Sequence, residues 1–204
     1  LKTLSVINAN RQNISDSGIL MRLACMQAAT ESRAIGGIEP SRKLDKIIDG
    51  AAGSVSDSAA LALCLTDRAF DRRNRGDGTG SVIDAEAALK YLDQRESLRP
   101  AAISVRTLIA DNKRQRGELD EAIRMYEKAL ADFAALGRER SLPARNAMGE
   151  LATAYNGTGQ PRRAVALLEQ VLQITPPNTM PAHSPLMINY ARFVAEVGQL
   201  QKSD

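Results

Sequence analysis

Glycine residues recur along this chain at a nearly constant interval, and an alanine lies seven residues before each of them. The glycines are Gly36, Gly76, Gly117, Gly159 and Gly198, at intervals of 40, 41, 42 and 39 residues, and the alanines are Ala29, Ala69, Ala110, Ala152 and Ala191. A period of this length is typical of repeat proteins, in which each repeat is one supersecondary unit. We therefore expect a row of similar units rather than a single large core.

The clearest unit surrounds Gly117. Ala110 precedes this glycine by seven residues, Ala122 and Ala129 follow it by five and twelve, and the flanking segments have helical apolar periodicity. Alanine on facing helices lets their axes approach to about 8–10 Å, and glycine takes the backbone conformation that closes the first helix before the chain reverses. The unit is therefore predicted to be an antiparallel helix pair.

The unit around Gly159 has the same layout, with Ala164 in the second helix, although Val171 replaces the second alanine there. In the two earlier units, Gly37 and Gly78 are equally acceptable as turn glycines. The two central units alone are sufficient to define the pattern.

These residues resemble the tetratricopeptide repeat, whose alanines and turn glycine have this arrangement. The resemblance implies an all-α fold, a right-handed superhelix of antiparallel helix pairs that forms one solenoid over residues 1–204 with a concave inner face. The expected units are residues 16–50, 57–97, 101–137 and 143–176, with a partial unit at 185–204. The observed interval exceeds the family's usual length of about 34 residues, so that each helix or linker must be extended.

Apolar periodicity predicts where the helices lie. The expected spans are residues 16–33, 40–49, 57–74, 82–96, 101–116, 119–136, 143–157, 161–174 and 185–197. Residues 1–8 are interpreted as the tail of an earlier second helix. Three glycines between residues 74 and 80 predict a longer turn with about four inserted residues, and the prolines of residues 175–185 predict a non-helical connection.

Composition and cysteine usage disfavour several classes of function. The formal net charge is +3, from 27 basic and 24 acidic residues, and aromatic residues make up only 3%. Nucleic-acid binders concentrate basic charge on one face and often add stacking aromatics, and a membrane span needs about 20 apolar residues, so neither partner is expected. Cys25 and Cys64 lack a CxxC partner and His183 is the only histidine. We therefore expect buried thiols, no metal site and no cofactor.

No group of residues predicts catalysis. Residues 76–80 lack the lysine and flanking strand of a phosphate loop and the acidic ligand series of a calcium loop, so they are interpreted as a turn between helices. The acidic residues Glu118, Asp120 and Glu121 fall in the first turn of a helix, where negative charge suits the helix dipole. The chain is therefore not expected to be an enzyme.

In tetratricopeptide repeats the first helix of each pair lines the concave groove, so groove residues should recur at fixed positions before the turn glycine. Arg33, Arg73, Arg114 and Asn156 each stand three residues before a glycine. Arginine presents a planar fork of donors that suits carboxylates, so the predicted partner is a protein or peptide with an acidic segment. The alternative is ordinary solvated charge near helix ends. The full candidate peptide-binding set is Arg33, Phe70, Arg73, Thr107, Asp111, Arg114, Thr153, Asn156 and Arg192.

The predicted function is a non-enzymatic scaffold that binds a protein or peptide in this groove. The alternative hypothesis is a sensory or regulatory segment of a bacterial transcription activator or serine/threonine kinase, which a kinase or DNA-binding domain before Leu1 would favour. Because the first residue is Leu1, the chain is interpreted as a piece of a longer protein. A cytoplasmic location is expected, and the sequence contains no signal for an oligomeric state.

Overall fold

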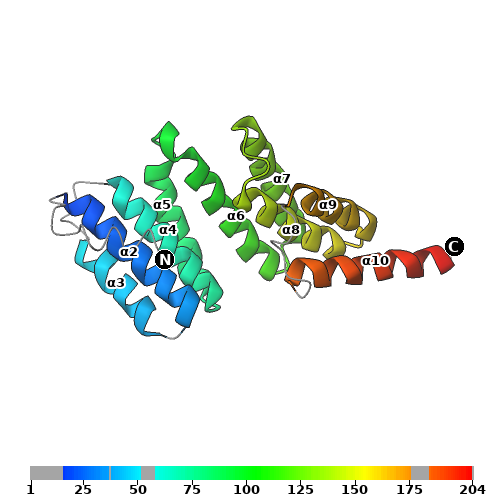
Figure 1. Cartoon of the computed structure of the whole chain (residues 1–204), viewed down its shortest axis with the longest axis horizontal. Coiled ribbons are helices and arrows are strands. Elements are labelled where there is room, and N and C mark those ends of the chain that lie inside the picture. The colour runs from blue at the N-terminus through cyan, green and yellow to red at the C-terminus, as the bar shows by residue number, and fades with distance from the viewer. Residues whose placement is uncertain (1–15, 37, 52–57, 176–183, 204) are drawn as a thin grey trace. The chain divides into compact units, whose positions relative to one another are not determined.

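The computed structural model describes residues 16–36, 38–51, 58–175 and 184–203. These ranges consist of helices and short turns with no strand (Figure 1), which confirms the all-α prediction. The interpretation of residues 1–8 and the position of His183 lie outside the described residues. The helices are α2 (Ser17–Ile35), α3 (Glu39–Ala51), α4 (Ser58–Asn74), α5 (Gly78–Leu92), the 3-10 helix η2 (Glu96–Leu98), α6 (Arg99–Gln115), α7 (Leu119–Ala135), α8 (Leu142–Gly157), α9 (Pro161–Ile174) and α10 (Pro185–Ser203).

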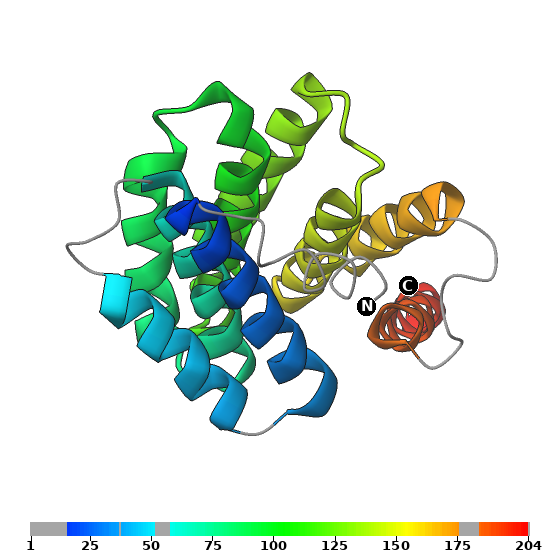
Figure 2. The ribbon, with the colours of Figure 1, turned by 60° about the vertical axis from the view of Figure 1, so that its left-hand side comes forward.

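Contacts between helices fall into two compact units, Leu1–Val105 and Arg106–Asp204, and the boundary lies inside α6. In the first unit, α2 packs against α3 and α4, and α4 packs against α5. Figure 2 shows α2 and α3, in dark and light blue, side by side. In the second unit, α8 packs against α7, α9 and α10. Within each unit a first helix therefore contacts its own second helix and the next first helix, and one solenoid over residues 1–204 stays a prediction.

Four glycines close the first helices in the left-handed backbone region that favours this residue. Gly36, Gly76, Gly117 and Gly159 have φ angles of 71°, 84°, 83° and 74°. The amides of Gly117 and of the following residue each donate to a carbonyl of the last turn of α6 at 3.0 Å, a common helix ending. The predicted turns are confirmed, and Gly76 rather than Gly78 is the turn glycine of the second pair.

Two predictions about glycines are wrong. The turn at residues 74–80 has no insertion, because α5 begins at Gly78 and is capped by Asp77, whose carboxylate accepts a hydrogen bond from the Gly80 amide at 2.8 Å. A Cβ on Gly80 would lie 2.2 Å from that carboxylate and would displace the cap. Gly198 does not end a helix, since α10 continues to Ser203.

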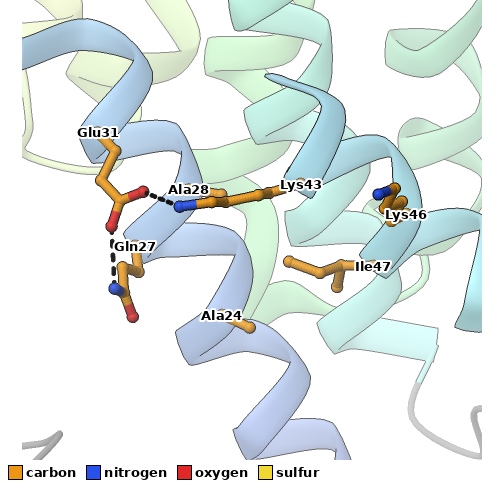
Figure 3. A pocket seen from close by; sticks show the side chains of 7 residues that line it. All are labelled: Ala24, Gln27, Ala28, Glu31, Lys43, Lys46 and Ile47. Carbon is orange, nitrogen blue, oxygen red and sulfur yellow. Dashed lines mark hydrogen bonds and ion pairs between the residues drawn. The ribbon is translucent and has the colours of Figure 1, made fainter. Parts of the chain in front are cut away.

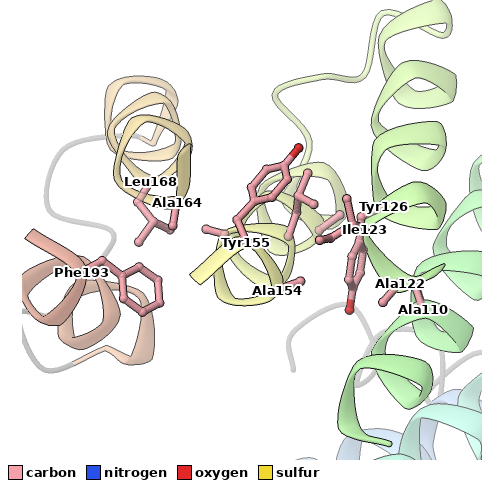
Figure 4. Packing of buried hydrophobic residues seen from close by; sticks show 12 residues of the cluster. Ala110, Ala122, Ile123, Tyr126, Ala154, Tyr155, Ala164, Leu168 and Phe193 are labelled. Atoms are coloured by element: carbon pink, nitrogen blue, oxygen red, sulfur yellow. The ribbon is translucent and has the colours of Figure 1, made fainter. Parts of the chain in front are cut away.

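The alanines at the helix crossings of the second unit are buried, as predicted. Ala110, Ala122, Ala152 and Ala164 are each 0% exposed, so the paired helices approach closely at these points. Ala191 has the equivalent place in α10 but is exposed, because no second helix covers α10 among the described residues. The alanines pack in one apolar cluster (Figure 4) with the larger side chains of Ile123, Tyr126, Tyr155, Leu168 and Phe193.

The helices of the first unit are cross-linked by a disulfide and by ion pairs. The disulfide joins Cys25 of α2 to Cys64 of α4, so the prediction of two buried thiols is right about burial and wrong about the thiols. Arg68 of α4 donates to both carboxylate oxygens of Asp84 in α5, at 2.8 Å each, and lies 3.1 Å from Asp49 in α3. Such two-point pairing fixes the geometry of the three helices as well as stabilising their contact.

Candidate functional site

The candidate binding residues lie on the first helices of the pairs. Arg33 ends α2 and is exposed, whereas Arg73 on α4, Arg114 on α6 and Asn156 on α8 are half-buried. The C-terminal turns of α4, α6 and α8 therefore each carry a polar side chain that lies neither in the apolar core nor fully in solvent. Arg33 and Arg73 belong to the first unit, and Arg114 and Asn156 belong to the second.

Arg114 connects neighbouring first helices in the second unit. Its Nη2 atom lies 2.8 Å from the Oε2 atom of Glu150 on α8. Burial acts to lower the pKa of Arg114, but attraction to Glu150 and contacts with Tyr126 and Asp111 outweigh burial and raise the pKa above its ordinary value. Arg114 is therefore a cation whose charge is matched within the fold.

Asp111 faces the second helix of its own pair. It is 7% exposed and accepts a hydrogen bond from the hydroxyl of Tyr126 on α7. Burial, and then the nearby Asp111 carboxylate, raise the pKa of Tyr126 well above the ordinary tyrosine value, so this hydroxyl stays protonated and remains a donor. The contact of Asp111 with Tyr126 joins α6 to α7.

Polar residues also connect α8 to α10. The Thr153 hydroxyl donates to the Gly149 carbonyl at 3.1 Å and accepts from Nδ2 of Asn189 at 3.4 Å. Arg192, exposed on α10, donates to Oδ1 of Asn189 at 3.2 Å and lies over the ring of Phe193, 5.0 Å from its centre. Asn189 was not among the sequence-predicted residues, because it stands nine residues before Gly198, and the candidates were drawn from positions three, six and ten residues before each glycine.

Two side-chain polar atoms, one on α6 and one on α8, are buried and not in contact with solvent. The Nε atom of Arg114 and the Oδ1 atom of Asn156 are buried and have no hydrogen-bond partner within the described part of the chain. Buried polar atoms are usually paired, so an unpaired donor and an unpaired acceptor on adjacent first helices indicate bound water, or side chains that rearrange when a partner binds. The remaining candidate on α6, Thr107, is half-buried.

The first unit brings together other residues than those predicted. Nη2 of Arg33 donates to the Thr30 hydroxyl at 3.4 Å, and Phe70 is half-buried on α4. Residues outside the candidate set make polar contacts between α2 and α4, among them Arg22 with Asp67 and Ser32 with Asp71. None of these four residues occupies one of the recurring positions from which the candidate set was drawn.

A shallow cavity of about 300 Å³ lies between α2 and α3 (Figure 3). Ala24, Ala28 and Ile47 form its apolar lining, and an ion pair of 3.0 Å between Glu31 and Lys43 crosses its edge. Enzyme pockets combine an enclosed apolar wall with several convergent polar groups, which this open cavity does not provide. Among the described residues there is also no group of three or more His, Cys, Asp or Glu placed to hold a metal ion. None of the described helices has the length and apolarity needed to cross a membrane.

The fold and the polar first-helix face define a helical repeat protein. Residues 101–176, which contain α7, α8, α9 and most of α6, match the family model of the tetratricopeptide repeat. This segment therefore belongs to the tetratricopeptide repeat family, as its sequence pattern predicted. No curated protein is found to be similar to this sequence.

Solved structures with this fold extend the likeness beyond the matched segment. The nearly identical TPR-like repeats of a putative kinesin light chain from Podospora anserina have 21% identity and a TM-score of 0.68, over 92% of this chain and 91% of that one. BtubC (BKLC) from P. vanneervenii has 19% identity and a TM-score of 0.73, over 98% and 84%. The apo form of RapI has 14% identity and a TM-score of 0.68, over 97% and 55%. At such identities the likeness shows the fold alone.

Proposed function

We propose that this chain is a non-enzymatic scaffold that binds a protein segment along the first helices of its repeats. Tetratricopeptide repeats are typical of such scaffolds, because stacked helix pairs present an extended surface without a closed pocket. The observation that carries the proposal lies in the second unit, where Arg114 on α6 and Asn156 on α8 each stand three residues before a turn glycine and are half-buried. The other donors of these two half-buried side chains suit the carbonyl groups of an extended peptide backbone.

The proposed partner carries an acidic segment. Arg33 and Arg192 are exposed, and the half-buried guanidinium of Arg114 has donors beyond the one that meets Glu150. The Glu150 carboxylate competes with the partner for Arg114, because both would use the same planar fork of donors. Partly exposed charge pairs are screened over a Debye length of about 8 Å at physiological ionic strength, so binding should weaken as salt is added.

The experiment selects peptides from a random dodecapeptide library on the immobilised chain and measures their affinities by fluorescence anisotropy. We expect the selected peptides to be enriched in Asp and Glu. Arg114→Gln should weaken their binding by about fivefold or more, equivalent to roughly 1 kcal/mol, whereas Glu150→Gln should strengthen it because the competing carboxylate is gone. Arg124→Gln, at an exposed position of the second helix α7, is the matched control and should leave affinity unchanged.

Equal affinities of wild type and Arg114→Gln for the selected peptides would contradict the proposal, and so would selection without acidic enrichment. Far-UV circular dichroism of each variant separates lost binding from lost fold. The alternative role, a sensory or regulatory segment of a bacterial transcription activator or serine/threonine kinase, would use the same face. The two roles differ only in whether this segment is joined to a DNA-binding or kinase domain. The sequence of the full-length reading frame distinguishes them.

A further inference from the structure

The disulfide of the first unit joins two successive first helices at positions that differ by one residue, eleven before Gly36 and twelve before Gly76. Cys25 of α2 and Cys64 of α4 are 39 residues apart in sequence, and their Cα atoms are 5.5 Å apart, within the range that disulfides require. Both residues are 0% exposed. The chain contains two cysteines in all, so no other pairing within it is possible.

Contacts other than the disulfide also hold α2 against α4. Arg22 of α2 pairs with Asp67 of α4, one helical turn from the cysteines on each helix, and Ser32 donates to Asp71 farther along the same contact. These polar contacts set the register of the two helices. The folded chain therefore holds the thiols at a high effective concentration, which favours closure over reaction with a second molecule.

We infer that Cys25 and Cys64 form a structural staple, and that the protein consequently works in an oxidising compartment. The thiolate of one cysteine attacks a sulfur of an external disulfide, either a small-molecule disulfide or the disulfide of an oxidase, which forms a mixed disulfide and releases the other sulfur as a thiolate. The second thiolate then attacks this intermediate and closes the staple. Two electrons and two protons pass to the oxidant, which leaves as two thiols.

Burial distinguishes a staple from a redox switch. Redox-sensing cysteines are accessible to their oxidant and reductant, whereas a disulfide with both residues 0% exposed is protected until the helices separate. Structural disulfides persist in oxidising compartments and are rare in the reducing cytosol. The cytoplasmic location expected from the sequence therefore conflicts with the chemistry of the first unit.

Thiol trapping tests the staple directly. The chain is refolded in glutathione buffers that range from fully reduced to the poise of an oxidising compartment, then treated with maleimide in denaturant and weighed by mass spectrometry. At the oxidising end we expect a species two hydrogens lighter than the dithiol and without maleimide. Two maleimide adducts at the oxidising end would overturn the inference.

Thermal unfolding tests whether the staple matters to the fold. Closing a loop of this length in the unfolded chain should raise the melting temperature of the oxidised protein by at least about 5 °C over the dithiothreitol-reduced protein. The control is the double variant Cys25→Ala/Cys64→Ala, whose melting temperature should not respond to dithiothreitol. If this variant fails to fold, the reduced wild type supplies the comparison by itself. Equal melting temperatures of oxidised and reduced wild type would overturn the assignment to an oxidising compartment.

Discussion

Replacing Tyr126 by phenylalanine tests the buried polar contact between α6 and α7. Tyr126 is 0% exposed, and its hydroxyl donates to Asp111, which is 7% exposed. A hydrogen bond to a charged acceptor contributes about 1.5–3 kcal/mol, and Tyr126→Phe removes the donor while leaving the carboxylate buried. We therefore expect the free energy of unfolding at neutral pH to fall by about that amount.

The same tyrosine should make stability depend on pH. Burial and Asp111 raise the pKa of Tyr126 in the folded protein, whereas a tyrosine in the unfolded chain titrates near about pH 10. Below that pH both states keep the proton and the contribution of Tyr126 is fully present. Above it the unfolded chain loses a proton that the folded chain keeps, so the wild type loses up to about 1.4 kcal/mol per pH unit through this group. The deficit of Tyr126→Phe relative to the wild type should therefore shrink at alkaline pH.

Urea unfolding followed by far-UV circular dichroism measures both effects at about pH 7, 9 and 11. The control is Tyr91→Phe, the same chemical change at a half-buried position of α5 outside this contact, which should alter the unfolding free energy by less than about 0.5 kcal/mol. A Tyr126→Phe variant as stable as the wild type at neutral pH would refute the reasoning. A deficit that stays constant up to pH 11 would show that the hydroxyl does not hold its proton through burial.

Two further substitutions test the packing and the turns. Ala122→Leu should overpack the crossing of α6 and α7 and cost about 1–3 kcal/mol, seen as a lower thermal midpoint, and an unchanged midpoint would mean that this crossing is not close-packed. Gly117→Ala places a side chain on a residue with a φ of 83° and should lower the unfolding free energy by about 1 kcal/mol or more. Gly198→Ala lies within α10 and should raise the unfolding free energy by up to about 1 kcal/mol, because alanine favours a helix interior more than glycine does. If Gly198→Ala instead loses stability, the sequence-based prediction of a turn at Gly198 would be supported over a continuous helix α10.

The turn glycines and crossing alanines were predictable because each is fixed by a constraint within one helix pair. Gly117 needs a positive φ, and Ala122 needs a small volume, whatever surrounds the pair. Gly198 satisfies the same interval but lies inside a continuous helix. Glycine costs a helix interior only about 1 kcal/mol, which tertiary context readily outweighs. The start of α5 was mispredicted because glycines usually indicate a turn, and Gly78 and Gly80 were therefore assigned to one. In the structure they form the first turn of α5, which the Asp77 carboxylate caps.

Contacts between pairs were harder to predict, although one of them left a signal. The 39-residue separation of Cys25 and Cys64 is one residue short of the repeat, so the two cysteines occupy nearly equivalent positions on first helices that pack together. Combining this interval with the repeat period would have predicted their contact. Arg114 and Glu150 offer no such signal, because they stand three and nine residues before their turn glycines.

Glu150 therefore determines how the proposed acidic selectivity can arise. Arg114 lies between the carboxylates of Asp111 and Glu150, and both already raise its pKa by attraction. A partner's carboxylate gains little binding energy from Arg114 while two carboxylates already neutralise its charge. It gains more if it replaces one of them. Asp111 is held by Tyr126 in the helix pair, whereas the Glu150 side chain on the neighbouring first helix is one-third exposed and can be approached from solvent. If a partner's carboxylate replaces Glu150 at Arg114, the number of ion pairs stays the same. The exchange would then account for the preference for acidic partners, and contacts of the partner's backbone along the helices would supply the affinity.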